Sequence, residues 1–385
     1  MAAPVFDVDT LLKDPELKVL VTCGSGGVGK TTTAAALALR AAEQGRRVVV
    51  LTIDPARRLA QALGLTELDN TPRLVAGVGA DGSGALLAMM LDMKSTFDEV
   101  VSANTTPAKA EQIFANPFYQ SLSASFAGTQ EYMAMEKLSQ LRARLVERGE
   151  WDLIVVDTPP SRSALDFLDA PQRLGRFLDG RMIRLLTAPA RAGGKAYLKM
   201  VSASFSMFTK VLNKILGNDL LLNVSAFIAS LETMFGGFRE RAEQTYQLLK
   251  APGTAFVVVS SPEPDALREA SFFVERLQTE GMPLAGVVLN RMRLSGLNLS
   301  ASRAAEAAER LAESPEQSEA VRLTAAALLV HAENAEAARH DRSMVARFGA
   351  AHPEVAQQQV PALATDVHDL VGLRTIGDAL AGVSD

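Results

Sequence analysis

Short, continuously apolar runs alternate with longer stretches of helical periodicity along most of the chain. Several of these runs show no alternation with polar residues, so we expect strands that are covered on both faces, as in a parallel sheet flanked by helices. The expected strands are residues 18–23, 47–53, 86–91, 152–157, 254–260 and 284–290, with a weaker one at 355–360. This pattern predicts an α/β fold with a doubly wound, mostly parallel sheet.

Two intervals, 95–150 and 171–250, contain no convincing strand. We interpret them as helical insertions between strands, because apolar residues recur in the second interval three or four positions apart. The remaining segments, 1–94, 151–170 and 251–385, would build the sheet domain.

One stretch of the sheet domain has a different composition. Residues 295–339 are rich in Ala, Glu and Arg. Ala, Glu and Arg are strong helix formers, so we expect helix here, with a solvated face.

Composition narrows the class of protein. With 48% hydrophobic and 22% charged residues in 385, the chain is typical of a globular protein with a large core. The formal net charge of −5 argues against a general nucleic-acid surface, so we expect no nucleic-acid partner. Cys23 is the only cysteine, which excludes disulfides and Cys-cluster metal sites within one chain. Residues 1–18 lack the apolar core of a signal peptide, and no apolar run reaches about 18 residues, so we expect a cytoplasmic location.

A glycine-rich loop follows the first expected strand and leads directly into an expected helix. It satisfies the pattern Gly-x-x-x-x-Gly-Lys-Thr in the strand–loop–helix context of a P-loop. The glycines let backbone N–H groups point at phosphate oxygens, the lysine is expected to reach the β- and γ-phosphates, and the last threonine is expected to bind Mg²⁺. A glycine-rich turn without a ligand is the alternative. The nucleotide-binding residues are Gly24, Ser25, Gly26, Gly27, Val28, Gly29, Lys30, Thr31 and Thr32.

Two aspartates end expected strands near this loop. Asp54 follows the strand at 47–53, where it could orient or deprotonate the attacking water, although it could also act as a helix N-cap before Pro55. Asp157 ends an apolar strand, as in a Walker B motif, and we expect it to hold the Mg²⁺ shell together with Thr31. The alternative is an ordinary aspartate at the end of a strand. These parts predict a Mg²⁺-dependent ATPase in which Lys30 and Asp54 are catalytic.

The loop Gly-Gly-Val-Gly-Lys-Thr-Thr, the sequence Asp54-Pro-Ala and the sequence Asp157-Thr-Pro-Pro resemble the arsenical-pump and tail-anchored-protein-targeting ATPases. These are dimerising P-loop ATPases, and the resemblance extends over nearly the whole chain. It implies that Asp54 activates water and that Asp157 opens the second switch segment. It also implies that Asn290 reads adenine and that the segment with Pro361 and Ala362 covers the base.

The chain departs from this family at Ser25, where relatives carry a lysine that reaches the partner's nucleotide. Such charge-stabilising groups are worth orders of magnitude in rate. We therefore expect slow hydrolysis by the chain alone or completion of the site by a related ATPase in a hetero-oligomer, with a homodimer as the alternative. The Cys-x-x-Cys pair that binds zinc between targeting subunits is absent after Asn290.

The purpose of the ATPase is expected to lie in the helical insertions. The resemblance to the targeting ATPases implies that they form an effector or client subdomain, whose apolar residues could line a groove for a hydrophobic client protein or a membrane-associated factor. The alternative is that these residues form only a helical core. A partition or positioning ATPase working on a surface is an alternative, and so is a small-molecule kinase. An arsenical pump subunit is less expected, because As(III) needs several thiolates. The candidate groove residues are Met200, Phe205, Met207, Phe208, 220–222, Phe227, Met234 and Phe235.

Overall fold

The computed structural model describes residues 3–54, 56–79, 84–116, 119–120, 130–159, 241, 243–315 and 318–383. The chain divides into two compact units. Unit 1 comprises Met1–Met89, Gly149–Ala164 and Leu249–Asp385, and unit 2 comprises Met90–Arg148 and Leu165–Leu248.

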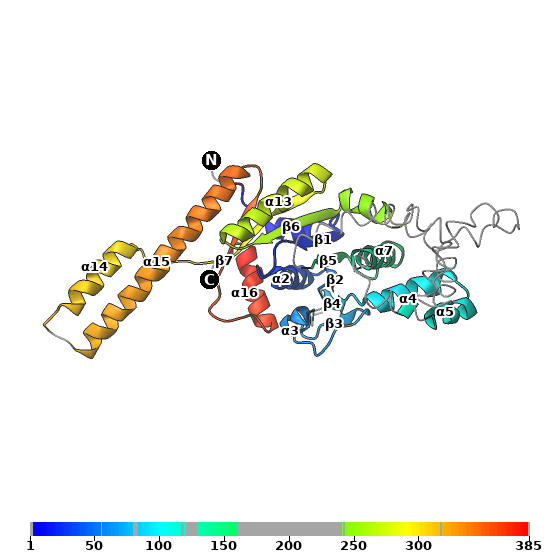
Figure 1. Ribbon diagram of the computed structural model, residues 1–385, viewed down its shortest axis with the longest axis horizontal. Coiled ribbons are helices and arrows are strands. Elements are labelled where there is room, and N and C mark those ends of the chain that lie inside the picture. Colours follow the sequence, from blue (N-terminus) through cyan, green and yellow to red (C-terminus); the bar gives the residue numbers. More distant parts are fainter. Residues whose placement is uncertain are drawn as a thin grey trace, which may run out of the picture. The chain divides into compact units, whose positions relative to one another are not determined.

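Unit 1 is built on a sheet of eight strands in the order β3-β4-β2-β5-β1-β6-β7-β8 (Figure 1). The central strands pair in parallel from β2 through β5, β1, β6 and β7 to β8, and only β3 pairs antiparallel, with β4. The predicted α/β fold with a mostly parallel sheet is therefore confirmed. The strands are β1 Val19–Cys23, β2 Arg47–Thr52, β3 Arg73–Leu74, β4 Ala85–Met90, β5 Leu153–Asp157, β6 Thr254–Ser260, β7 Leu284–Met292 and β8 Gln357–Pro361.

All residues of β1, β5 and β6 are buried, as expected for continuously apolar strands between two helical layers. The helices of unit 1 lie around this sheet, except that α14 and the first half of α15 extend away from it (Figure 1). α2 packs on β1, β2 and β5, whereas α13 packs on β6 and β7. These helices are α1 Val8–Lys13, α2 Lys30–Glu43, α3 Arg58–Ala62, α13 Pro264–Glu280, α14 Ala301–Ala312, α15 Glu319–Ala351 and α16 Leu370–Leu380.

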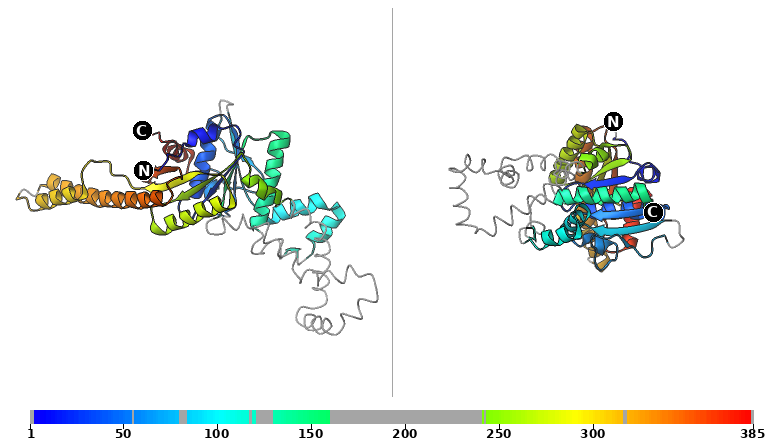
Figure 2. Two further views of the ribbon diagram at one scale, coloured as in Figure 1. Left: turned by 90° about the horizontal axis from the view of Figure 1, so that it is seen from above. Right: turned by 90° about the vertical axis from the view of Figure 1, so that its right-hand side faces the viewer.

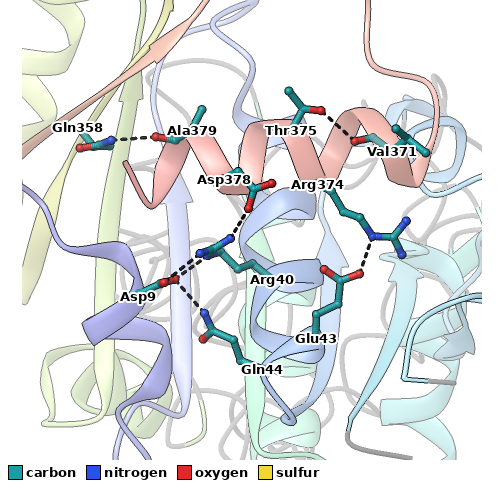
Figure 3. Close-up of polar contacts among 10 residues, drawn as sticks. All are labelled: Asp9, Arg40, Glu43, Gln44, Gln358, Val371, Arg374, Thr375, Asp378 and Ala379. Carbon is teal, nitrogen blue, oxygen red and sulfur yellow. Dashed lines mark hydrogen bonds and ion pairs between the residues drawn. The ribbon is translucent and has the colours of Figure 1, made fainter. Parts of the chain in front are cut away.

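An arginine cluster fixes α2 against α1 and α16 (Figure 3). Arg40 Nε lies 2.5 Å from Asp9 Oδ1, and Arg40 Nη1 lies 2.8 Å from Asp378 Oδ1. Gln44 Nε2 donates to the same Asp9 oxygen at 2.8 Å. The hydrogen bonds from Arg40 lower the pKa of Asp9, although burial opposes the shift. Because α2 begins at Lys30, this cluster holds the helix that follows the glycine-rich loop.

The prediction of helix at 295–339 is wrong in its bounds. The structure contains two helices here, α14 and α15, and the second runs on to Ala351. Each begins at a serine N-cap: Ser300 accepts a hydrogen bond from the Arg303 N–H, and Ser318 accepts one from the Val321 N–H. Figure 1 and the left view of Figure 2 show α14 along the first half of α15, and the two helices are in contact. Residues 295–300 lie outside any helix.

Unit 2 is helical in its described part, with α4 Met93–Asn104, α5 Pro107–Phe114 and α7 Gln130–Arg148. Ion pairs join its segments: Lys137 Nζ lies 2.9 Å from Glu99 Oε2, and Arg241 Nε lies 2.9 Å from Glu136 Oε2. The candidate groove residues between Met200 and Phe235 lie outside the described residues. Among the helices that the structure describes, none combines the length and the apolar character needed to cross a membrane.

Candidate nucleotide-binding site

The carboxyl ends of the central strands bring the predicted site residues together. Strand register pairs Thr22 of β1 and Thr52 of β2 with the same residue of β5, Asp157. In an open parallel sheet this edge is where ligands bind. The glycine-rich loop leaves β1 one residue after Thr22 pairs with Asp157, so the loop starts at this edge.

The glycine-rich loop needs glycine at positions 24 and 29 for steric reasons. A Cβ atom on Gly24 would lie 2.0 Å from the carbonyl oxygen of Val259, and a Cβ atom on Gly29 would lie 2.3 Å from Asn290 Nδ2. Gly29 also has a φ of +93°, a left-handed conformation that side chains other than glycine rarely adopt. Gly29 is the N-cap of α2 and offers no capping side chain. The first turn of α2 therefore presents backbone N–H groups and the positive end of the helix dipole, which suit an anion.

Lys30 is buried within the loop that it follows. Its Nζ donates to the carbonyl oxygen of Ser25 at 2.7 Å. Burial lowers the pKa of Lys30, whereas the charges of Asp157 and Asp54 raise it. The ammonium group of Lys30 has three N–H donors, and the Ser25 carbonyl uses one of them. The others can donate to phosphate oxygens.

Asp157 is the most buried of the predicted site residues, with no exposed surface. Its Oδ2 accepts hydrogen bonds from Thr31 Oγ1 and Thr52 Oγ1, both at 2.8 Å. Its Oδ1 is buried without a hydrogen-bond partner. Burial raises the pKa of Asp157 to about 6, although the two hydroxyls and Lys30 act in the opposite direction.

This donor set fits a magnesium ion. Mg²⁺ prefers carboxylate and hydroxyl oxygens and is usually held by one or two protein oxygens plus substrate phosphates. The orphaned oxygen of Asp157 requires a partner, because a buried acceptor without one is costly. The hydroxyl of Thr31 lies beside it.

Asp54 lies two residues beyond Thr52. Its backbone N–H donates to Thr52 Oγ1 at 3.2 Å, and its Oδ1 accepts from the Ala56 N–H at 3.0 Å. The alternative role as a helix N-cap is wrong, because α3 begins at Arg58 and its N-cap is Arg57. The Asp54 charge raises the pKa of both Lys30 and Asp157. Asp54 therefore belongs to the same electrostatic environment as the loop.

Asn290 contacts the glycine-rich loop directly. Its Nδ2 donates to the carbonyl oxygen of Val28 at 2.9 Å, and its Oδ1 accepts from the Arg291 N–H at 2.9 Å. Arg291 has a φ of +59°, the only positive φ of a non-glycine residue in the described part of the chain. Backbone strain of this kind collects at functional sites.

Pro361 and Ala362 follow on the neighbouring strand β8. Pro361 pairs with Met292 of β7, and the Ala362 N–H donates to the Met292 carbonyl oxygen at 2.9 Å. The structure thus places both residues beside the end of β7, two residues beyond Asn290. In the described part of the chain, neither residue forms a hydrogen bond with the glycine-rich loop.

Sequence reasoning missed Thr52. Its hydroxyl donates to Asp157 Oδ2 and accepts a hydrogen bond from the Asp54 backbone N–H. A threonine at the end of a strand carries no signal in itself. Its importance follows from the pairing of β2 with β5, two strands about a hundred residues apart along the chain.

The glycine-rich loop lies between a buried parallel strand and a helix, and a buried aspartate on the neighbouring strand binds the threonine that follows the loop. Together these features define a P-loop nucleotide-binding protein. The model of the family described as Anion-transporting ATPase matches residues 17–306. The chain belongs to this family, and it is an ATPase.

Three relatives cover most of the chain, each at 26% identity. "ATPase get3" of Schizosaccharomyces japonicus aligns over 291 residues, which are 74% of this chain and 78% of that protein. "ATPase GET3" of Podospora anserina aligns over 288 residues, 74% and 76% of the two chains. "ATPase ASNA1 homolog" of Cryptosporidium parvum aligns over 301 residues, 76% and 72%. The predicted resemblance to the arsenical-pump and targeting ATPases is confirmed at the level of the family.

Proposed function

We propose that the chain hydrolyses ATP with Mg²⁺ at the edge of the sheet formed by β1, β2 and β5. The observation that carries the proposal is the hydrogen bond of Thr31 to Asp157 beside an unsatisfied Asp157 oxygen. Thr31 and Asp157 would hold the ion, directly or through water. When bound, Mg²⁺ would supply positive charge that neutralises the phosphate oxygens.

In this proposal the chain's own residues bind and orient the nucleotide. The N–H groups of Gly24 to Gly29 and the first turn of α2 bind the phosphates. Lys30 turns from the Ser25 carbonyl to the β- and γ-phosphates. Asp54 orients the attacking water and accepts its proton. Asn290 and the segment of Pro361 and Ala362 hold the base.

Equilibrium binding tests the metal assignment. Calorimetry with a non-hydrolysable ATP analogue, with and without Mg²⁺, would be performed on the wild type, Asp157→Asn and the surface variant Asp265→Asn. We expect Mg²⁺ to tighten analogue binding by the wild type and Asp265→Asn at least tenfold more than binding by Asp157→Asn. Equal Mg²⁺ dependence in all three would refute the assignment.

We propose further that the ATPase works as one subunit of a pair. Ser25 supports this proposal, since it offers no cation where relatives carry a lysine, and its Oγ is buried without a hydrogen-bond partner. The partner is a related ATPase that supplies the missing charge, with a homodimer of this chain as the alternative. Native mass spectrometry of the affinity-purified chain in ATP, using Asp54→Asn to slow hydrolysis, distinguishes the two by subunit mass.

The proposed task of the pair is to handle a hydrophobic client in the cytoplasm. This part of the proposal is supported by the family and by the apolar stripes of the sequence. The alternative of an arsenical pump is disfavoured by Cys23, because burial raises the pKa of its thiol to about 12. No group of three or more His, Cys, Asp and Glu side chains in the described part of the chain is placed to hold a metal ion. Stimulation of ATP turnover by a hydrophobic peptide, and not by arsenite, is the expected result.

A further inference from the structure

One face of α15 is buried at one end of the helix and uncovered at the other. The face recurs every three or four residues: Leu323, Ala327, Val330, Asn334, Ala338, Asp341, Val345 and Phe348. The last four are buried, and the first four are exposed. Leu323 and Val330 keep 64% and 58% of their surface in solvent. A face that forms core at one end thus continues as exposed surface, which is apolar at Leu323, Ala327 and Val330 and polar at Asn334.

The buried end of α15 is anchored to the ATPase unit. Arg293, just beyond β7, binds both carboxylate oxygens of Asp341 through its guanidinium group, and its backbone N–H donates to Oδ2 at 3.0 Å. α15 also packs on β7 and α13. This anchor gives the first half of α15 a fixed direction as a continuation of one 33-residue helix.

α14 leaves the exposed face free because it covers another side of the same helix. That side recurs as Val321, Ala325, Leu328, Ala332 and Ala335, all buried or half-buried. α14 contributes Ala304 and Ala308 to this contact, and both are buried. The spacing of four and three residues is that of close antiparallel helix packing. The match to the family model ends at residue 306, before α15 begins.

We propose that the exposed face of α15 binds the same face of a second copy of this chain, antiparallel and around a two-fold axis between Ala326 and Ala327. This register brings Leu323 opposite Val330 of the second copy, and Ala326 opposite its Ala327. An interface around a two-fold axis must be complementary to itself, and these four positions satisfy that condition.

Charge supports the same register. Arg322 and Glu333 lie on one flank of the apolar face, and in the antiparallel pair their positions differ by about 3 Å along the helix axis. Neither side chain forms an ion pair or side-chain hydrogen bond with another described residue, so both are available to a second copy. Each copy would supply one Arg322 and one Glu333, which gives two equivalent ion pairs. In a parallel, in-register pair, each Arg322 would instead face its own counterpart.

The contact is short. About 15 residues of helix span about 22 Å, so the buried area falls below that of a standard stable interface. We therefore expect a dimer that depends on protein concentration. It forms without nucleotide and is distinct from the pairing proposed above, in which the partner supplies a charge to the nucleotide site.

Cysteine cross-linking tests the register, since Cys23 is buried and is the only natural cysteine. We expect Leu323→Cys and Val330→Cys chains, mixed without nucleotide, to form a disulfide between the two variants. Each variant alone should cross-link poorly, because seven residues of helix separate identical positions by about 10 Å, beyond the reach of a disulfide. Cross-linking of each variant with itself but not with the other would show a parallel pair, and no cross-link in any sample would overturn the proposal.

Sedimentation of the full chain tests the contact independently. Val330→Gln should raise the dimer dissociation constant at least tenfold, whereas Val371→Gln, an equally exposed valine on α16, should leave it unchanged. Arg322→Glu should also weaken the dimer, and adding Glu333→Arg should restore it. ATP turnover of Val330→Gln should equal that of the wild type, which separates this contact from the ATPase. A wild type that stays monomeric at high concentration, or that binds only a different protein on this face, would overturn the proposal.

Discussion

Thr31 Oγ1 donates a 2.8 Å hydrogen bond to Oδ2 of Asp157, which joins the first turn of α2 to the end of β5. The two residues are 126 positions apart in the chain. The contact brings the two expected Mg²⁺ ligands together and leaves the second Asp157 oxygen buried and unsatisfied. Replacing Asp157 by an uncharged residue is therefore expected to raise the stability of the nucleotide-free protein and to lower its activity.

Replacement of Asp157 by Asn is expected to stabilise the nucleotide-free protein at pH 7 by on the order of 1–3 kcal/mol, since it removes a buried charge. The same change should lower the Mg²⁺-dependent ATP turnover at least a hundredfold. Urea unfolding and phosphate release measure the two effects. A loss of stability together with activity would show that Asp157 acts mainly through its hydrogen bonds.

The pH dependence follows from the same group. Because the pKa of Asp157 is raised to about 6, the folded state binds a proton that the unfolded state releases between pH 4 and 6. Ionisation of Asp157 therefore lowers the free energy of unfolding progressively as pH rises through this window. The stability difference between wild type and Asp157→Asn should therefore grow from pH 4 to pH 7. A difference that is constant over this range would contradict the raised pKa.

Gly29→Ala is expected to impair nucleotide binding and to destabilise the fold by about 1–3 kcal/mol. The added methyl group would meet the Asn290 amide at 2.3 Å in a left-handed backbone conformation. Gly64→Ala is the matched control, because Gly64 has a φ of +67° but open space around its Cβ position. Thermal unfolding and analogue binding should separate the shared backbone strain from the collision, which only Gly29→Ala produces.

Arg40→Ala is expected to destabilise the chain by about 1–3 kcal/mol by removing the ion pairs to Asp9 and Asp378 (Figure 3). Because Arg40 lowers the pKa of Asp9, this stabilisation is present above the ordinary pKa of about 4 and is lost as pH falls below it. Arg339→Ala on α15 is the control: Arg339 is an exposed arginine in an exposed ion pair, so we expect no measurable change in the free energy of unfolding. Equal unfolding free energies for the two variants at pH 7 would contradict the role of the cluster.

Asp341→Asn is expected to cost about 2–4 kcal/mol, since it leaves the Arg293 contact without its buried carboxylate. Burial tends to raise the pKa of Asp341, but the hydrogen bonds from Arg293 outweigh it, so the pKa is lowered overall. Hydrogen exchange should show the loss first in α15. Protection of α15 that is unchanged by the variant would contradict the anchoring role.

Local patterns were sufficient to predict the sheet. All seven expected strands lie within two residues of observed strands at each end. Continuously apolar runs such as residues 153–156 are stable only when they are buried, so they mark the core strands. β3 was missed because its two residues, Arg73 and Leu74, form no apolar run, and Leu74 is 64% exposed. Its place depends only on antiparallel pairing with β4.

The part of the candidate site that could be predicted is the part whose conformation follows from a single sequence motif. The loop from Gly24 to Thr31 has fixed spacing, so its position between strand and helix followed from the sequence. Thr52 and the link from Asn290 to Val28 were not predictable in this way. Both depend on which strands become neighbours, and that order is set by long-range packing that no short pattern encodes.

The most direct test of the proposed ATPase mechanism is the rate of phosphate release by the full chain with Mg²⁺, for the wild type and Asp54→Asn. We expect Asp54→Asn to bind the ATP analogue as tightly as the wild type and to release phosphate at least a hundredfold more slowly. Saturating the wild type with Mg²⁺-ATP should give turnover that disappears with EDTA. Undiminished phosphate release by Asp54→Asn, or metal-independent turnover, would contradict the mechanism.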